Sequence, residues 1–261
     1  MSPGVRYLTA SSLPLDSAAT MDTTPASNRA KQRPQYIVRP YRPEDRAAVR
    51  AICADTGFLG QPIDPAFEDR ELFADYLTSY YTDVEPQSTF VCELDGEVKG
   101  YIMGSRFPKR KAAFERRLLP TLVVRGLWRY FTRPYNAASR RYVRWIITKA
   151  RKENPFTPPD IPHLHLNIRP VARSVATTRE LVDIFLQYLY DNGDKQVYAQ
   201  VVAYESRRGY RTFERYGFRV IDEREVTKYR GMYPSKIYLF TVLKDLNLNP
   251  KLYGADLHEK G

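Results

Sequence analysis

The residues best suited to chemistry lie between a predicted strand, His163–Ile168, and a helix predicted to begin at about Thr178. The start of a helix presents unpaired backbone N–H groups, and small side chains let an anion approach them. The threonine hydroxyls there could also cap the helix or donate to the anion. This segment predicts either a loop that binds a phosphate-containing ligand or a capped helix without a ligand. Its residues are Arg173, Ser174, Val175, Ala176, Thr177 and Thr178.

Polar residues at the end of the next predicted strand, 196–203, could move protons. Tyr204 ends that strand, Glu205 follows it, and Tyr210 lies in the helix predicted after it. A positioned tyrosine can act as an acid, and a carboxylate can take a proton directly or through water. Glu205, Tyr210 and Tyr204 are therefore candidate catalytic residues. The alternative is packing for the two tyrosines and solvation for the glutamate.

Cysteine and histidine residues do not form a metal-binding pattern. The two cysteines, Cys53 and Cys92, show no spacing typical of metal ligands. Of the three histidines, His163 and His165 share one face of a predicted strand, and His258 lies near the C-terminus. Because zinc needs three or four converging ligands, we expect two buried thiols and no metal site.

Hydrophobic periodicity predicts an α/β fold. Leu72, Phe73 and Tyr76 recur at helical spacing, whereas the segment around Asp95-Gly96 alternates with a period of two on both sides of a strong hairpin turn signal. The predicted order is β-α-α-β-β, an insertion, then β-α-β-α-β-β. The predicted elements are strand 35–41, helices 43–56 and 67–81, strands 89–94 and 97–105, strand 163–168, helix 178–190, strand 196–203, helix 206–218, and strands 219–229 and 236–243.

Length and composition indicate one domain with terminal tails. With 261 residues and 43% hydrophobic composition, the chain can bury a sizeable core. No run of 18 uncharged apolar residues and no secretory signal is visible, so we expect a cytoplasmic protein. Residues 1–34 are rich in Ser, Thr, Ala and Pro and are predicted to be disordered. The domain is predicted over 35–245, followed by a C-terminal tail, 246–261.

The element order and three local segments resemble the GNAT N-acetyltransferase superfamily. Residues 100–105, GYIMGS, are similar to a central strand of that family. Residues 166–182 are similar to its acyl-CoA loop, and 204–218 to a later helix that ends in Gly-Phe. The strand before the loop looks closest to the branch that includes the acetyltransferase-like domain of O-GlcNAc hydrolase. The resemblance covers roughly 36–105 and 161–245, and it implies a mixed, mostly antiparallel sheet flanked by helices.

The resemblance implies acetyl-CoA as co-substrate and an amine, of unknown identity, as acceptor. Family members hold thioester and acceptor where two parallel strands splay apart, which here would be 163–168 and 196–203. The loop would hold the pyrophosphate, and backbone N–H groups at the end of the first strand would polarise the thioester. The residues placed at the cofactor are Ile168, Arg169, Val171, Arg173, Ser174, Val175, Ala176, Thr177, Thr178, Ser206 and Phe213.

The sequence departs from the family pattern at four of these positions. Ala176 and Thr178 replace two glycines of the loop, which would cost about 1 kcal/mol or more wherever positive φ is required. Ser206 and Phe213 replace an Asn and a Tyr of the later helix, and a phenylalanine cannot donate a proton. The predicted activity is N-acetyl transfer by direct attack of the amine on acetyl-CoA. The alternative is a GNAT-like module that binds without catalysis.

A basic insertion, 106–160, separates the two halves of the predicted fold. From Arg106 to Glu153 it carries fifteen Lys or Arg and two acidic residues, a net charge of +13, against +11 for the whole chain. Its prolines predict several short helices, in which apolar stripes around Trp128 and Trp145 alternate with arginines. Three alternatives remain open: a helical lid over the acceptor pocket, peripheral contact with an anionic membrane, and, less favoured, nucleic-acid binding. In the last two, the fold could serve only to present the insertion.

Overall fold

The computed structural model describes residues 36–132, 135–204, 214 and 216–246. The predicted N-terminal tail and nearly all of the C-terminal tail lie outside the described residues. So do four of the candidate site residues, namely Glu205, Ser206, Tyr210 and Phe213.

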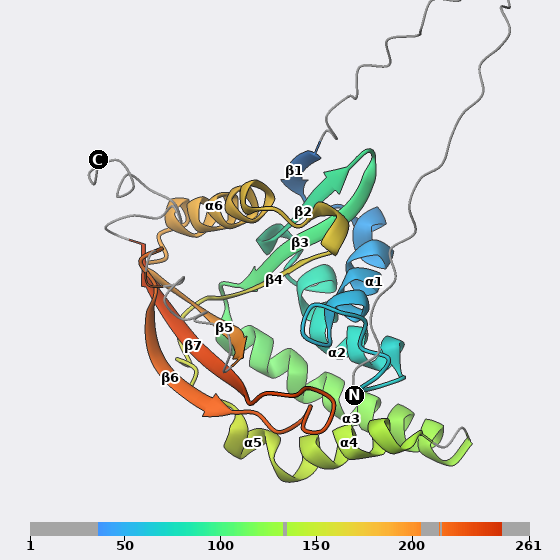
Figure 1. The fold of residues 1–261 in the computed structure, drawn as a ribbon. Helices are drawn as coiled ribbons and strands as arrows, with labels where there is room; N and C mark the ends of the chain where they lie inside the picture. The colour runs from blue at the N-terminus through green and yellow to red at the C-terminus, as the bar shows by residue number, and fades with distance from the viewer. Residues whose placement is uncertain (1–35, 133–134, 205–213, 215, 247–261) are drawn as a thin grey trace, which may run out of the picture. The chain divides into compact units, whose positions relative to one another are not determined.

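Seven strands form one sheet in the order β1-β2-β3-β4-β5-β7-β6 (Figure 1). Neighbouring strands are antiparallel except β4 and β5, which run parallel. With helices on its two faces, this sheet confirms the predicted α/β fold class. The strands are β1 (Tyr36–Pro40), β2 (Thr89–Leu94), β3 (Glu97–Ser105), β4 (His163–Ile168), β5 (Gln196–Tyr204), β6 (Arg219–Glu225) and β7 (Ile237–Asp245).

Helices cover both faces of the sheet (Figure 1). On one face lie α1 (Arg46–Thr56) and α2 (Arg70–Asp83), and on the other lies α6 (Val175–Asp191). Leu181 and Phe185 of α6, four residues apart, are fully buried in the larger hydrophobic core. The sheet is thereby held between two apolar layers.

The turn between β2 and β3 has the backbone that its sequence predicts. Asp95 and Gly96 both adopt positive φ, 51° and 82° respectively. Both residue types reach this region at low cost, so a two-residue hairpin forms here. On its other edge β3 pairs with β4, with Gly100 opposite Ile168.

The insertion contains one long helix where several short ones were predicted. α3 spans Pro108–Thr132, and it is followed by α4 (Ala137–Thr148) and the short α5 (Ala150–Glu153). The prediction that Pro120 divides the first segment was wrong, because α3 continues through it. A proline removes one helical hydrogen bond, and contacts of α3 with the rest of the domain compensate for that loss.

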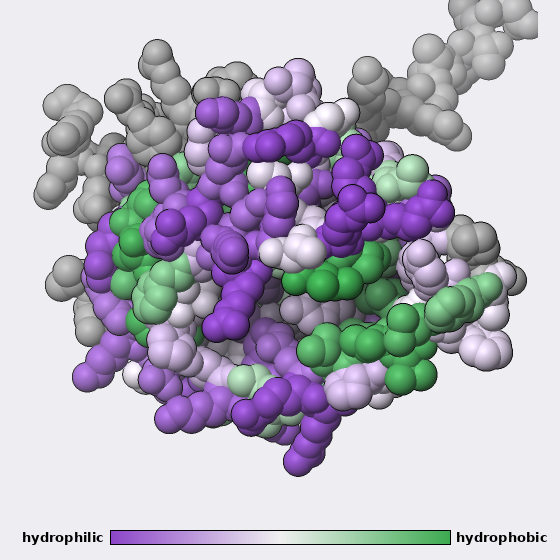
Figure 2. Space-filling model, turned by 90° about the horizontal axis from the view of Figure 1, so that it is seen from below, coloured by the Kyte–Doolittle hydropathy of each residue, from purple (hydrophilic) through white to green (hydrophobic). Residues whose placement is uncertain are grey.

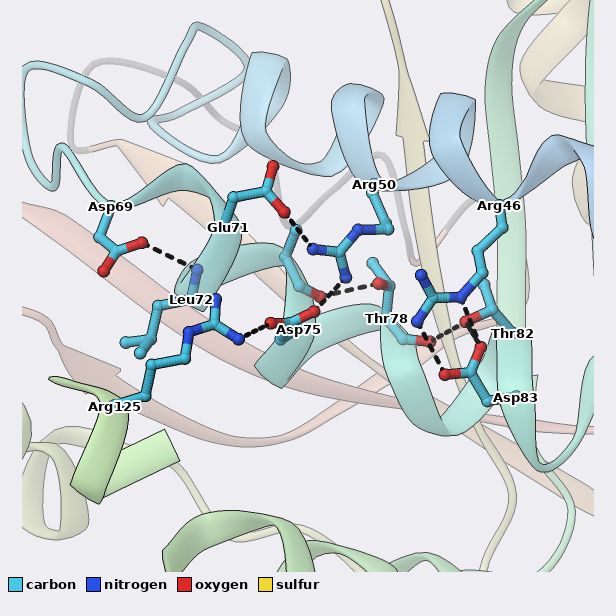
Figure 3. Close-up of polar contacts among 11 residues, drawn as sticks. Arg46, Arg50, Asp69, Glu71, Leu72, Asp75, Thr78, Thr82, Asp83 and Arg125 are labelled. Atoms are coloured by element: carbon cyan, nitrogen blue, oxygen red, sulfur yellow. Dashed lines mark hydrogen bonds and ion pairs between the residues drawn. The ribbon is translucent and has the colours of Figure 1, made fainter. Parts of the chain in front are cut away.

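Ion pairs between α3 and α2 supply those contacts. Arg125 donates to Asp75, which also accepts from Arg50 of α1 (Figure 3). One turn further along α3, Arg129 Nη1 lies 2.5 Å from Oδ1 of Asp69, whose side chain is fully buried. The side of α3 that carries these arginines therefore faces the domain.

Candidate functional site

The central feature of the site is a gap in the sheet between β4 and β5. These parallel strands pair only where they begin, at His163 with Tyr198 and Leu164 with Ala199. Beyond those pairs, β4 stays bonded to β3 and β5 stays bonded to β7. The two strands therefore diverge toward their carboxyl ends, at the place the resemblance implied.

Backbone donors at the end of β4 divide into two sets. Arg169 donates its N–H to the carbonyl of Lys99, 2.9 Å away, so this predicted donor is already used. In an antiparallel pair, successive N–H groups alternate between the two edges of the strand. Since Arg169 N–H points to β3, the N–H groups of Ile168 and Leu166 point toward the gap. The N–H of Ile168 therefore stays a candidate donor, whereas the N–H of Arg169 is already bonded to Lys99.

The loop after β4 leads into the N-terminus of α6. Helix α6 begins at Val175, three residues before the predicted start. Ser174 caps it, because its Oγ accepts from Thr177 N–H at 3.0 Å. Val175 and Ala176 are exposed, and in the described part of the chain their N–H groups meet no acceptor. Two backbone donors and the positive end of the helix dipole thus face solvent here.

Replacement of the loop glycines does not strain the backbone. Ser174 has φ of −139°, and in the described residues positive φ outside glycine occurs only at Leu59 and Asp95. The strain expected at Ala176 and Thr178 is therefore absent. The loop enters the helix through a short 3-10 turn, Pro170–Ala172, in which every residue has ordinary negative φ.

Two arginines brace the loop through their side chains. Arg169 contacts Asp55 of α1 through Nε and Nη2, at 2.9 and 2.6 Å. Arg173 donates from Nη2 to the carbonyls of Ile168, at 2.9 Å, and Gly60, at 3.4 Å. Both side chains tie the end of β4 to α1 or to the chain that follows it. Val171 is exposed beside them.

Tyr204 is the one candidate catalytic residue that the structure describes. Its hydroxyl donates to the carbonyl of Leu59 at 3.4 Å, and its ring packs on Tyr233 with 4.8 Å between centroids. These contacts place the end of β5 against the segment that follows α1. Its neighbours at this end of the strand include Glu205, whose position is not described.

A polar stripe on β4 includes the two histidines that the sequence analysis considered only as metal ligands. His163, His165 and Asn167 occupy alternate positions, so they share the face of β4 toward α1 and α2. His163 Nε2 lies 2.6 Å from the hydroxyl of Tyr81, and Asn167 Nδ2 donates to the hydroxyl of Tyr101 at 2.7 Å. The signal that could have found this stripe is the polar period of two in HLHLN.

Burial keeps both histidines of the stripe neutral near pH 7. Desolvation, and secondarily the charge of Lys111, lower the pKa of His165 from 6.5 to about 4. Burial likewise lowers the pKa of His163 well below its ordinary value. On the same side of the sheet, burial raises the pKa of the Cys53 thiol to about 11. Cys53 and Cys92 are buried and free, which confirms their prediction as buried thiols.

Among the described residues, no group of three His, Cys, Asp or Glu could hold a metal ion. In that same part of the chain, no helix is both long and apolar enough to cross a membrane. A groove of about 530 Å³ lies along α1 and α2, away from the gap in the sheet. Its three arginines form ion pairs with carboxylates of α1 and α2 (Figure 3 shows those of Arg46 and Arg50). We therefore do not assign this groove to the proposed site at the β4–β5 gap.

No protein-family model matches the chain, and no curated protein matches it. Among solved structures, SsHAT is similar, with a TM-score of 0.55 and 25% identity over 81% of this chain and 98% of that one. The chain has the GNAT fold. Other structures with this fold that resemble the chain include the polyamine N-acetyltransferase of Drosophila melanogaster, at 15% identity and a TM-score of 0.48 over 81% of this chain and 100% of that one. Another is yncA from Salmonella typhimurium, solved with its cofactor acetyl-CoA, at 12% identity and a TM-score of 0.46 over 84% and 99%.

Proposed function

We propose that the protein is an N-acetyltransferase that moves the acetyl group of acetyl-CoA to an amine by direct attack. The observation that carries this proposal is the divergence of β4 and β5 after Leu164 and Ala199, beside the N-terminus of α6. The gap offers a backbone donor for a carbonyl, and the helix offers donors for an anion. A thioester linked to a pyrophosphate needs both.

The N-terminus of α6 would hold the pyrophosphate. The N–H groups of Val175 and Ala176 lack protein acceptors, and the small residues around them leave the backbone accessible. Ser174 shapes this surface by capping the helix, so that only the first two N–H groups remain for a ligand. The two N–H groups that remain support our proposal that the loop binds the cofactor without the glycines of the family pattern.

The end of β4 would polarise the thioester carbonyl. The N–H of Ile168 points into the gap, where it can stabilise the negative charge that develops on that oxygen. Acetyl-CoA supplies an activated acyl group and a thiolate leaving group, so the protein needs only to bind, orient and manage protons. Glu205, Tyr210 and Tyr204 remain our candidates for proton transfer.

The acceptor is an amine whose identity is open. Arg169 and Arg173 link the end of β4 to α1 and the segment after it, so these elements form one wall of the proposed acceptor side. From the sequence of β4 we further infer a relationship with the branch that includes the acetyltransferase-like domain of O-GlcNAc hydrolase.

Thermal unfolding with acetyl-CoA, followed by an assay of thiol release with a panel of amines, tests the function. At about 100 times the dissociation constant, ligand binding stabilises a protein by about 2.7 kcal/mol, or roughly 5 to 10 °C for a domain of this size. We expect that shift together with amine-dependent thiol release. Stabilisation without release from any amine would indicate the GNAT-like binding module, and no stabilisation would reject the proposal.

A further inference from the structure

Helix α3 carries a strip of large apolar side chains that nothing in the described domain covers. Trp128 is 70% exposed and Phe131 is 79% exposed. Members of the strip are one, three or four residues apart, and helix geometry places all of them on one half of the helix surface. The full strip is Leu119, Val123, Val124, Leu127, Trp128 and Phe131, each at least half exposed.

The opposite side of α3 fixes which way this strip points. Leu122 is buried against the domain, and Arg125 and Arg129 pair with Asp75 and Asp69 (Figure 3 shows Arg125 reaching Asp75). Burying the strip against the domain would require α3 to rotate and to break both ion pairs. The strip is therefore an outward surface of the folded chain.

Basic residues continue the same side of α3 toward its N-terminus. Arg116 precedes Val123 by seven residues and Arg117 precedes Val124 by seven, which is two helical turns. Both arginines are exposed, and in the described part of the chain neither forms an ion pair. Figure 2 views this side of the molecule from below Figure 1 and shows hydrophobic side chains gathered among strongly hydrophilic ones. One helix side thus combines an apolar half with a cationic half.

We propose that this outer side of α3 docks on an anionic lipid surface. The unpaired arginines complement anionic headgroups, while the apolar strip can enter the boundary between headgroups and acyl chains. On α4, Ile147 is 77% exposed and Arg144 is exposed as well, which extends the same combination to the next helix.

Two other occupants suit the surface less well. A second copy of the chain, meeting this side by twofold symmetry, would present its own α3. The only acidic residue of α3, Glu115, already pairs with Lys111, so Arg116 and Arg117 would gain no anionic partner from that helix. Single-stranded nucleic acid gains much of its affinity from stacking on aromatic rings. Here the strip is largely aliphatic, with Val123, Val124 and Leu127 beside Trp128, and aliphatic groups offer no stacking surface.

Vesicle sedimentation with the full chain tests the proposal. Phosphatidylcholine vesicles are compared with vesicles that also contain phosphatidylserine. We expect binding to the second kind only, weakened by added salt. Each basic side chain near an anionic surface strengthens binding by roughly fivefold, so Arg116→Glu with Arg117→Glu should weaken it by roughly tenfold or more. Trp128→Ser with Phe131→Ser should weaken it at least as much.

Matched variants elsewhere on the domain serve as controls. Ile37→Ser removes an apolar side chain that is 51% exposed on β1, and Lys195→Glu with Arg219→Glu reverses two exposed charges outside the insertion. Both controls should bind vesicles as the parent protein does. Every variant should keep its stabilisation by acetyl-CoA, because none touches the β4–β5 gap.

Three results would overturn the proposal. The first is equal binding by the α3 variants and the controls, which would move any lipid contact to another surface. A second is binding to RNA, but not to vesicles, that depends on Arg116 and Arg117. The third is a concentration-dependent dimer that Trp128→Ser with Phe131→Ser abolishes, since the strip would then be covered by a second copy.

Discussion

The N-terminus of α6 and the outer side of α3 are both exposed surfaces suited to anions, yet they are built from different groups. At α6 the donors are backbone N–H groups of Val175 and Ala176, and the side chains need only be small. At α3 the cations are the side chains of Arg116 and Arg117. A surface made by backbone should tolerate changes of side chain, and the residues in place of the family's loop glycines leave its backbone unstrained. A surface made by side chains should not tolerate such changes.

The largest expected effect tests whether the ion pairs of α3 with the domain keep its apolar strip turned outward. Asp69→Ala removes the N-cap of α2, the partner of Arg129 and the acceptor of the Tyr135 hydroxyl. We expect the free energy of unfolding in urea to fall by about 3 kcal/mol. As a control, Asp64→Ala breaks an exposed pair with Arg70 and should cost less than about 1 kcal/mol. Equal losses would mean that Asp69 does not anchor α3.

A change of charge at the loop should separate helix capping from anion binding. Ser174→Asp and Ser174→Asn both supply a good N-cap, so each should keep the free energy of unfolding within about 0.5 kcal/mol of the parent. Only the aspartate repels a pyrophosphate. Calorimetry should show acetyl-CoA binding about tenfold or more weaker for Ser174→Asp than for Ser174→Asn. Similar affinities for the two variants would place the phosphates elsewhere.

The polar stripe on β4 should make stability depend on pH. Because the pKa of His165 is lowered to about 4 in the folded protein, the unfolded chain binds its proton first as the pH falls from 6.5. Stability is therefore complete above pH 6.5 and is lost as the pH falls toward about 4. Urea unfolding across this range should show a smaller loss for His165→Gln. An unchanged loss would assign the pH dependence to other groups, such as His163.

The smallest expected effect is at the apolar strip of α3. Trp128→Ser and Phe131→Ser remove side chains that contact mainly solvent in the isolated domain, so each should change the free energy of unfolding by less than about 0.5 kcal/mol. Thermal unfolding of each variant measures this. A loss comparable with that of Asp69→Ala would show that the strip packs against part of the chain and is not a free surface.

Local patterns predicted much of the fold. The Asp95-Gly96 turn, the strands of the hairpin and the period of α6 are set by neighbouring residues, and the structure has all three. The continuity of α3 through Pro120 could not be predicted in this way. Asp69 and Asp75, which pair with α3 and favour its position on the domain, are distant in sequence and meet it only after folding.

The elements around the proposed site were predicted better than its backbone geometry. The sequence indicated the loop at 173–178, and the resemblance to GNAT proteins implied the two strands that diverge. It did not show that Ser174 would cap α6, that the backbone would need no positive φ, or that the N–H of Arg169 would be used by Lys99. Which donors remain free follows from strand register and from the first turn of the helix, and both are properties of the folded chain.

The most direct test of the proposed cofactor site is to remove one backbone donor without changing the helix. Val175 is the first residue of α6, where proline is well tolerated, and Ser174 has the extended backbone, φ −139° and ψ 165°, that a following proline requires. Calorimetry should compare acetyl-CoA binding to Val175→Pro and to Val175→Ala, which keeps the N–H. We expect the proline variant to bind about tenfold or more weakly, with unchanged or higher thermal stability. Equal affinities would contradict the assignment of the pyrophosphate to the N-terminus of α6.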